Sequence, residues 1–294
     1  MTFLENLDKT KLQKITLIVI SALVLAALAL LLVIIIMSIT PKTPGLSAGL
    51  KDLTEYTVTD NDLNTGTLIL ADDDHPYLPK DSWLNLVNCS EFMADQPDAN
   101  YEAKDYENMN YIPWTAMRLS KTAMPHVHKM LTDAKAAVGE KPITIDAAYD
   151  TIKHGEQSPE YATALLILLS DFDSTGPTRE PLSKNYRKWL DENAVNYGFI
   201  KSFEDAYRYV GAPHAKLIND NKDISTLADY INYLKDNNVD GENKTVRVTV
   251  DGVEYAIYYA DCKKGDSIKI PADDDYTISG TNEGGVIVTV KLSK

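Results

Sequence analysis

The longest uninterrupted hydrophobic run in the chain lies near its start, at residues 15–37. These 23 residues include no charged residue, no glycine and no proline. An α-helix rises about 1.5 Å per residue, so about 20 apolar residues cross the roughly 30 Å hydrocarbon core of a bilayer. The run therefore predicts a transmembrane helix at 15–37, after a short cytoplasmic tail at 1–14. A cleaved signal peptide is the alternative, but its apolar region usually covers only about 7–15 residues.

Helical spacing of apolar residues recurs after the run. Residues 38–56 carry prolines and polar residues and predict a stalk, and the region 57–237 that follows predicts a folded domain. Ser183 precedes one helical segment and predicts its N-terminal cap. The segments within 115–138, 183–197 and 224–234 place the following residues inward at intervals of one, three or four positions: Val127, Leu131, Ala134 and Val138; Tyr186, Trp189, Leu190 and Ala194; Ile224, Leu227, Ile231 and Leu234.

Short apolar segments between these helices favour β-strands. Residues 67–70, 143–145 and 207–210 have strand character. The segment 160–170 fits a buried strand or a buried helix, because its period alone does not separate the two. The mixture of helices and strands predicts an α+β fold. Apolar spacing along the passage from helix to strand predicts that these aromatic and aliphatic residues are largely buried core residues: Trp189, Tyr197, Phe199, Ile200 and Tyr209.

Residues 244–294 follow a different pattern, after a polar linker at 237–243. Alternating valines at 246–250 lead into Asp251-Gly252, a dipeptide that favours a tight hairpin turn. The pattern predicts strands on both sides of this turn, a further strand pair near 267–270 and 276–279, and a last strand at 286–290. We therefore expect a β-rich C-terminal module that packs on the preceding domain, since it is small for an independent fold.

Composition narrows the classes of partner. The net charge is −14 and the sequence pI is about 4.8. No cluster of lysine and arginine appears, so the chain lacks the basic face of a nucleic-acid-binding protein. Cys89 and Cys262 fall in different predicted domains. They either form one disulfide outside the cell or serve as two separate small hydrophobic residues.

Four segments, in their order and spacing, resemble the VanY-type D-alanyl-D-alanine carboxypeptidases, which are zinc peptidases of bacterial cell walls. The first is Leu68-Ile-Leu-Ala-Asp-Asp-Asp-His-Pro-Tyr77, similar to the entry strand and loop of that family. The second, Trp189-Leu-Asp-Glu-Asn-Ala-Val-Asn-Tyr-Gly-Phe-Ile200, resembles its helix-to-strand passage. The third, Tyr207-Arg-Tyr-Val-Gly-Ala-Pro-His-Ala215, resembles the stretch after its catalytic motif. The β-rich segment 276–289 resembles a tail carried by some members. The resemblance implies a carboxypeptidase-like fold over about 57–290.

The chemical positions of that family differ in this chain. The family places two zinc ligands in Ser-x-His-x-x-Gly-x-Ala-x-Asp, and the resemblance puts Tyr161 at the histidine and Leu168 at the aspartate. The third ligand lies in Glu-x-x-His and falls on Ala206 or, with one residue missing, on Tyr207. Under that shifted alignment Glu204 remains as the former general base. A catalytic zinc takes three protein ligands and a water, so the resemblance predicts that zinc is absent here.

Further candidate sites are weaker. The family's substrate-binding arginine, in Ser-Gly-Tyr-Arg, falls near Asp146-Ala-Ala-Tyr-Asp150, where no arginine occurs. His126 and His128 are two residues apart on a predicted helix and point to different sides. We expect the histidines at 75, 154 and 214, and the carboxylates of Asp171-Phe-Asp173, to be solvated or internally bonded residues. The residues expected to line the remaining cleft are Tyr149, Asp150, Tyr161, Leu168, Glu204, Tyr207, Arg208 and His214.

Three functions remain open from the sequence. The favoured hypothesis is a zinc-free pseudopeptidase, anchored in the bacterial cytoplasmic membrane with most of the chain outside, that binds peptidoglycan stem peptide or an envelope protein. A working hydrolase with an unrecognised site is the second, and a purely structural envelope module is the third. No cofactor other than the family's zinc is implied, and no nucleic acid is expected.

Overall fold

The computed structural model describes residues 18–20, 22–23, 50, 52–94, 117–139, 143–150, 158–171, 181–237, 245–272 and 275–292. The chain divides into two units, Met1–Pro44 and Gly45–Lys294, and the second contains the sheets described below. The predicted transmembrane segment lies outside the described residues except at 18–20 and 22–23, which are helical. Within the described part of the chain, no helix is both long enough and apolar enough to cross a membrane.

The second unit has the mixed helix and sheet composition that the sequence predicts. The described helices are α2 (Asp60–Asn64), η2 (Asp81–Trp83), α3 (Cys89–Ala94), α5 (Met124–Val138), η3 (Pro159–Thr163), α6 (Lys184–Asn193), η4 (Ala194–Tyr197), α7 (Ala212–Asp220) and α8 (Leu227–Asp236). The described strands are β1 (Leu53–Thr57), β2 (Leu86–Asn88), β3 (Met117–Ser120), β4 (Ile143–Ala147), β5 (Tyr149–Asp150), β6 (Leu166–Asp171), β7 (Phe199–Phe203), β8 (Ala206–Tyr209), β9 (Val246–Val250), β10 (Val253–Ala260), β11 (Ser267–Pro271), β12 (Asp275–Gly280) and β13 (Val286–Lys291).

A four-stranded antiparallel sheet with the order β4-β6-β8-β7 forms the centre of the carboxypeptidase-like region. One face of this sheet packs against α5 and α6 in the largest hydrophobic cluster, which includes Val127, Leu131 and Tyr186. Ser183 caps α6 as predicted, because its hydroxyl accepts a hydrogen bond from the backbone N–H of Tyr186. The segment 160–170 resolves into η3 followed by β6, so its apolar end is a strand.

Several predicted boundaries are wrong. The helix predicted within 115–138 begins only at Met124, where Pro125 lies in the first turn, and Met117–Ser120 before it is a strand. The strand predicted at 67–70 is irregular, although Leu68 and Leu70 are buried. The pattern did not predict α7, which begins beside Gly211 and carries Pro213 in its first turn.

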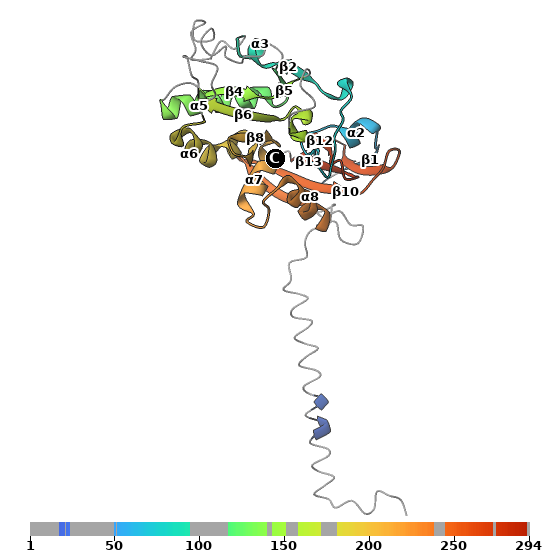
Figure 1. The fold of residues 1–294 in the computed structure, drawn as a ribbon. Coiled ribbons are helices and arrows are strands. Elements are labelled where there is room, and N and C mark those ends of the chain that lie inside the picture. Colours follow the sequence, from blue (N-terminus) through green and yellow to red (C-terminus); the bar gives the residue numbers. More distant parts are fainter. Residues whose placement is uncertain are drawn as a thin grey trace, which may run out of the picture. The chain divides into compact units, whose positions relative to one another are not determined.

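The C-terminal strands form the order β12-β13-β10-β9, with the predicted turn at Asp251-Gly252, where both residues have positive φ. The expected pairing of 267–270 with 276–279 is wrong. Strand β11 pairs instead with β1, and β12 pairs with β13. Residues 53–56, which the sequence assigns to a stalk, are therefore part of a strand. Figure 1 shows β1 and α2, in blue, beside the orange and red C-terminal strands.

The C-terminal sheet packs on the central region through α7 and α8. Their buried residues form one cluster with Val248, Ile257 and Ile287 of β9, β10 and β13. His214 of α7 is buried in this contact, where its ring bonds to the hydroxyls of Tyr230 and Thr289. Cys89 and Cys262 are both buried and free, and they lie in different hydrophobic clusters.

Candidate active site

The second face of the central sheet carries a small apolar cluster at the positions matched to zinc ligands. Tyr161 of η3, Leu168 of β6 and Ala206 of β8 pack there with Ala147 and Leu166. Side chains alternate between the two faces of a strand, so Leu166 and Leu168 face this cluster while their neighbours enter the main core. Leu168 lies directly opposite Ala206 in the antiparallel register. The folded chain thus brings together three positions that are distant in sequence.

The backbone at Ala164 supports the alignment with the zinc-ligand motif. When Tyr161 is matched to the histidine of that motif, its glycine falls on residue 164. Ala164 has φ of 56°, in the left-handed region that favours glycine, and its N–H donates to the carbonyl of Tyr161 over 3.0 Å. Ala164 therefore has a backbone conformation that favours glycine at the position matched to the motif's glycine.

The strand alternation also separates the two candidates for the third position. Ala206 belongs to the apolar cluster with Tyr161 and Leu168, whereas Tyr207 is 1% exposed and packs in the main core on the opposite face. The Tyr207 hydroxyl lies 3.4 Å from a carboxylate oxygen of Asp191, and burial, as the larger cause, raises the pKa of this tyrosine. Ala206 is therefore the position that faces the other two.

The side chains at these three positions do not fit a catalytic zinc. Such a metal needs imidazole, carboxylate or thiolate ligands, and leucine and alanine have no donor atom. A phenol is protonated near neutral pH and is a poor ligand. Among the residues that the structure describes, no group of three or more histidine, cysteine or acidic side chains is placed to hold a metal ion.

Glu204 lies in the turn between β7 and β8, close to the apolar cluster. It is exposed and has φ of 37°, a conformation that is uncommon for a residue with a side chain. Glu204 and Leu168 both line a cavity of about 600 Å³. Polar walls of this cavity come from Asp146, Lys201 and an ion pair in which the Arg187 guanidinium donates two hydrogen bonds of 2.7 Å to Asp205.

Other residues expected in the cleft lie on further elements, of which β5 contacts η3. Tyr149 is buried and, with Asp150, forms β5, which pairs with β3 and not with the central sheet. His214 lies in the contact with the C-terminal sheet. His126 packs against the ring of Tyr209 at 4.9 Å between centroids, and position 154 lies outside the described residues. The expectation that Tyr149 and His214 both line one cleft stays a prediction.

Two comparisons with known proteins bear on this arrangement. The chain is 28% identical over 258 residues to a D-alanyl-D-alanine carboxypeptidase of Enterococcus faecium. The aligned region covers 80% of this chain and 78% of that protein. The chain is thus similar in sequence to a D-alanyl-D-alanine carboxypeptidase over most of its length. The resemblance identified in the sequence is thereby confirmed. No family model matches the chain.

The fold of this chain also resembles that of a solved structure. It is similar, with a TM-score of 0.58 and 20% identity, to the vancomycin-resistance D,D-dipeptidase VanXYg in complex with a D-Ala-D-Ala phosphinate analogue. The match covers 81% of this chain and 99% of that one. The α+β prediction is confirmed by this likeness and by the described elements.

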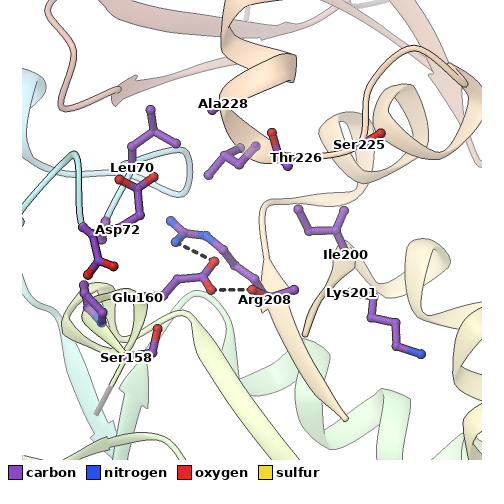
Figure 2. A pocket seen from close by; sticks show the side chains of 15 residues that line it. Leu70, Asp72, Ser158, Glu160, Ile200, Lys201, Arg208, Ser225, Thr226 and Ala228 are labelled. Carbon is purple, nitrogen blue, oxygen red and sulfur yellow. Dashed lines mark hydrogen bonds and ion pairs between the residues drawn. The ribbon is translucent and has the colours of Figure 1, made fainter. Parts of the chain in front are cut away.

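This chain has a second cavity beside the apolar cluster, and Arg208 of β8 lines it. Arg208 is 1% exposed, and its guanidinium donates to Glu160 over 3.2 Å and to the Ile69 carbonyl over 2.6 Å. Burial, the largest cause, lowers the pKa of Arg208, and Glu160 opposes that shift. Figure 2 shows Glu160, Arg208 and Asp72 converging on this cavity, whose volume is about 380 Å³.

The sequence pattern indicated Arg208 as a cleft residue but did not indicate Glu160 and Asp72, which line the same cavity. Glu160 precedes the ligand-matched Tyr161, and its acidic side chain was the available signal. Asp72 accepts hydrogen bonds from His75, which also bonds to Glu283, and these contacts outweigh the opposing effect of burial and raise the pKa of His75. The loop at 72–75 is thereby tied to the C-terminal sheet.

Proposed function

We propose that this chain is a zinc-free member of the D-alanyl-D-alanine carboxypeptidase group that binds cell-wall peptide, or a protein partner, and does not cleave it. The observation that carries the proposal is the apolar cluster of Tyr161, Leu168 and Ala206 at the ligand-matched positions. The left-handed backbone at Ala164, the position matched to the motif's glycine, supports this alignment. The segment at 15–37 would anchor the chain in the bacterial cytoplasmic membrane with its bulk outside.

The chemistry of the cluster argues against metal-assisted hydrolysis. A zinc site stabilises the attacking water and polarises the scissile carbonyl, and both effects require the ion to be held by fixed ligands. Placing a dication among leucine and alanine side chains would remove it from water without compensating donors, which is strongly unfavourable. Two basic side chains beside the cluster are already paired with carboxylates, Arg187 with Asp205 and Lys201 with Asp191.

A binding function is compatible with what the fold retains. The cavity lined by Leu168 and Glu204 lies beside the ligand-matched cluster and combines an apolar wall with acidic and basic side chains. Its volume of about 600 Å³ is within the range of cavities that hold small ligands, roughly 300–1,000 Å³. A peptide can occupy such a cavity without any residue acting as nucleophile or base.

Binding to stem peptide tests this proposal. The full-length chain, purified in detergent, is titrated with a fluorescent pentapeptide ending in D-Ala-D-Ala, in the presence and absence of a chelator. We expect saturable binding that the chelator does not change. Glu204→Trp should weaken binding because the larger side chain obstructs the cavity, whereas Glu192→Trp, at an exposed position of α6 outside that cavity, should not. Binding that requires zinc would contradict the proposal, and no binding would leave only the protein-partner form, tested by co-purification.

A further inference from the structure

The cavity around Arg208 contains more hydrogen-bond donors than it can satisfy internally. Arg208 is buried, and within the described part of the chain its Nε has no hydrogen-bond partner. A buried donor without a partner carries a desolvation cost of about 1–3 kcal/mol, so its presence calls for an explanation. Its other two nitrogens are bonded to Glu160 and to Ile69, which leaves Nε as the guanidinium nitrogen without a partner.

The start of helix α8 supplies two more donors to the same cavity. Leu227 and Ala228 are the first two residues of this ten-residue helix, and both line the cavity with Arg208. The first N–H groups of a helix have no partner within it. The Asp229 carboxylate accepts from the N–H groups of Ser225 and Thr226, and the Thr226 hydroxyl accepts from that of Asp229. No hydrogen bond of Leu227 N–H or Ala228 N–H is found among the described residues.

Two of the three carboxylates at the cavity, those of Glu160 and Asp72, are in contrast already hydrogen-bonded. One Glu160 oxygen accepts from Arg208 and the other from the Ser202 hydroxyl. Oδ1 of Asp72 accepts from the backbone N–H groups of Asp74 and His75 and bonds to the His75 ring. Asp73 is exposed at the cavity wall. Apart from the exposed Asp73, the groups left over are donors on one charged side chain and at one helix N-terminus, which together favour a negatively charged acceptor.

We propose that this cavity binds an oxyanion, a carboxylate or a phosphate group, between Nε of Arg208 and the N-terminus of α8. None of the three ligand-matched positions lines this cavity. The site therefore does not depend on whether the chain binds zinc or stem peptide. The cavity of about 380 Å³ can hold the anionic end of a small molecule or peptide.

One pair of variants tests the helix donors directly. Proline is well tolerated at the first helical position, and Thr226 before it has φ of −131° and ψ of 166°, a conformation compatible with a following proline. Leu227→Pro removes the N–H at that position, and Leu227→Ala removes a similar part of the side chain while keeping the N–H. Binding of inorganic phosphate and of N-acetyl-D-alanyl-D-alanine to the full-length chain is measured by calorimetry, with the C-terminal amide of the dipeptide as the neutral control.

The expected result is binding of at least one of the two anions, no binding of the amide, and affinity about tenfold weaker in Leu227→Pro than in Leu227→Ala, as for one lost hydrogen bond to a charged group. Phosphate binding alone assigns the site to a phosphate, and dipeptide binding alone assigns it to a carboxylate. Equal affinity in the two variants, or no anion binding at concentrations up to about 10 mM, would overturn the proposal.

A second variant keeps the test informative if the substitutions at 227 prevent folding. Glu160→Gln retains an acceptor for Arg208 but removes a negative charge beside the site. An oxyanion site should then bind its anion more tightly, because repulsion from Glu160 is gone. A purely structural role of the Arg208–Glu160 pair predicts lower stability without a gain in anion affinity, and that outcome would contradict the proposal.

Discussion

Leu168 of β6 and Ala206 of β8 face each other in the antiparallel pairing of the central sheet, and both pack against Tyr161. The resemblance to the VanY-type carboxypeptidases assigns that family's zinc-ligand positions to these three residues, and the fold brings them together, although leucine and alanine offer no donor atom. The shared backbone and the changed side chains are therefore separable properties.

Restoring ligands at the three facing positions should create a metal site. The triple variant Tyr161→His, Leu168→Asp and Ala206→His supplies two imidazoles and a carboxylate, a set of the kind that holds catalytic zinc. We expect one zinc ion per chain in the purified variant, measured by elemental analysis. Hydrolysis need not return, because the family's substrate-binding arginine is absent.

The control for this variant comes from the neighbouring residue. Replacing Ala206→His by Tyr207→His in the same triple variant places the third imidazole on the opposite face of the sheet, in the main core. That version should bind zinc much more weakly or misfold. Equal zinc affinity in the two triple variants would show that the alignment through Ala206 is incorrect.

Burial predicts different costs for two aromatic residues of α6. Tyr186 is fully buried, and Tyr186→Ala should reduce the free energy of unfolding by about 3–5 kcal/mol. Trp189 packs on the core but is only partly buried, so Trp189→Ala should cost about 1–3 kcal/mol. Denaturant unfolding of both variants measures these values. A larger loss for Trp189 than for Tyr186 would contradict the packing described for α6.

His214 should make the chain less stable in acid. Burial lowers its pKa to about 3, while an unfolded histidine titrates near its ordinary value of about 6.5. Between these values the unfolded chain binds a proton that the folded chain does not, so stability is present above about pH 6.5 and falls with pH by about 1.4 kcal/mol per unit. Folded carboxylates titrate in the same window, so the comparison is with His214→Gln. The free energy of unfolding of both proteins is measured from pH 7 to pH 4, and the difference between them should shrink as the pH falls. A difference that stays constant with pH would rule out the neutral buried imidazole.

Gly280 tests the attachment of α2 to the C-terminal strands. A methyl group at this glycine would lie 2.0 Å from the carbonyl oxygen of Leu63, at the end of α2. Gly280→Ala should therefore reduce the free energy of unfolding by about 1–3 kcal/mol or more, as overpacking does. Thr277→Ala, at an exposed position of the same strand, is the control and should change stability by less than about 0.5 kcal/mol. A neutral Gly280→Ala would place α2 elsewhere.

Local signals in the sequence predicted much of the central region. Helix α6 begins at its predicted serine cap, and Tyr186, Leu190 and Ala194 face inward because their spacing follows the helical period. The predictions for Phe199 and Tyr209 are also confirmed, since both are buried. Trp189, Tyr197 and Ile200 have intermediate burial and pack against the edges of the hydrophobic clusters. Periodicity gives the inward direction of a side chain but not how completely neighbouring elements cover it.

Long-range pairing was beyond the reach of the local pattern. Strand β1 pairs with β11 across more than half of the chain, and nothing in the alternation near 267–270 distinguishes that partner from β12. The choice between Ala206 and Tyr207 depended on which face of β8 each residue occupies, which the register with Leu168 determines. The Arg208 cavity likewise combines residues from the loop at 70–73, η3, β8 and α8, which only the folded chain brings together.

Zinc content measured together with D-alanine release tests the central claim most directly. The full-length chain is purified without chelator, analysed for bound metal, and incubated with a stem pentapeptide ending in D-Ala-D-Ala, with and without added zinc. The account predicts no stoichiometric zinc and no D-alanine release under either condition. One zinc ion per chain, together with D-alanine release that a chelator abolishes, would contradict it.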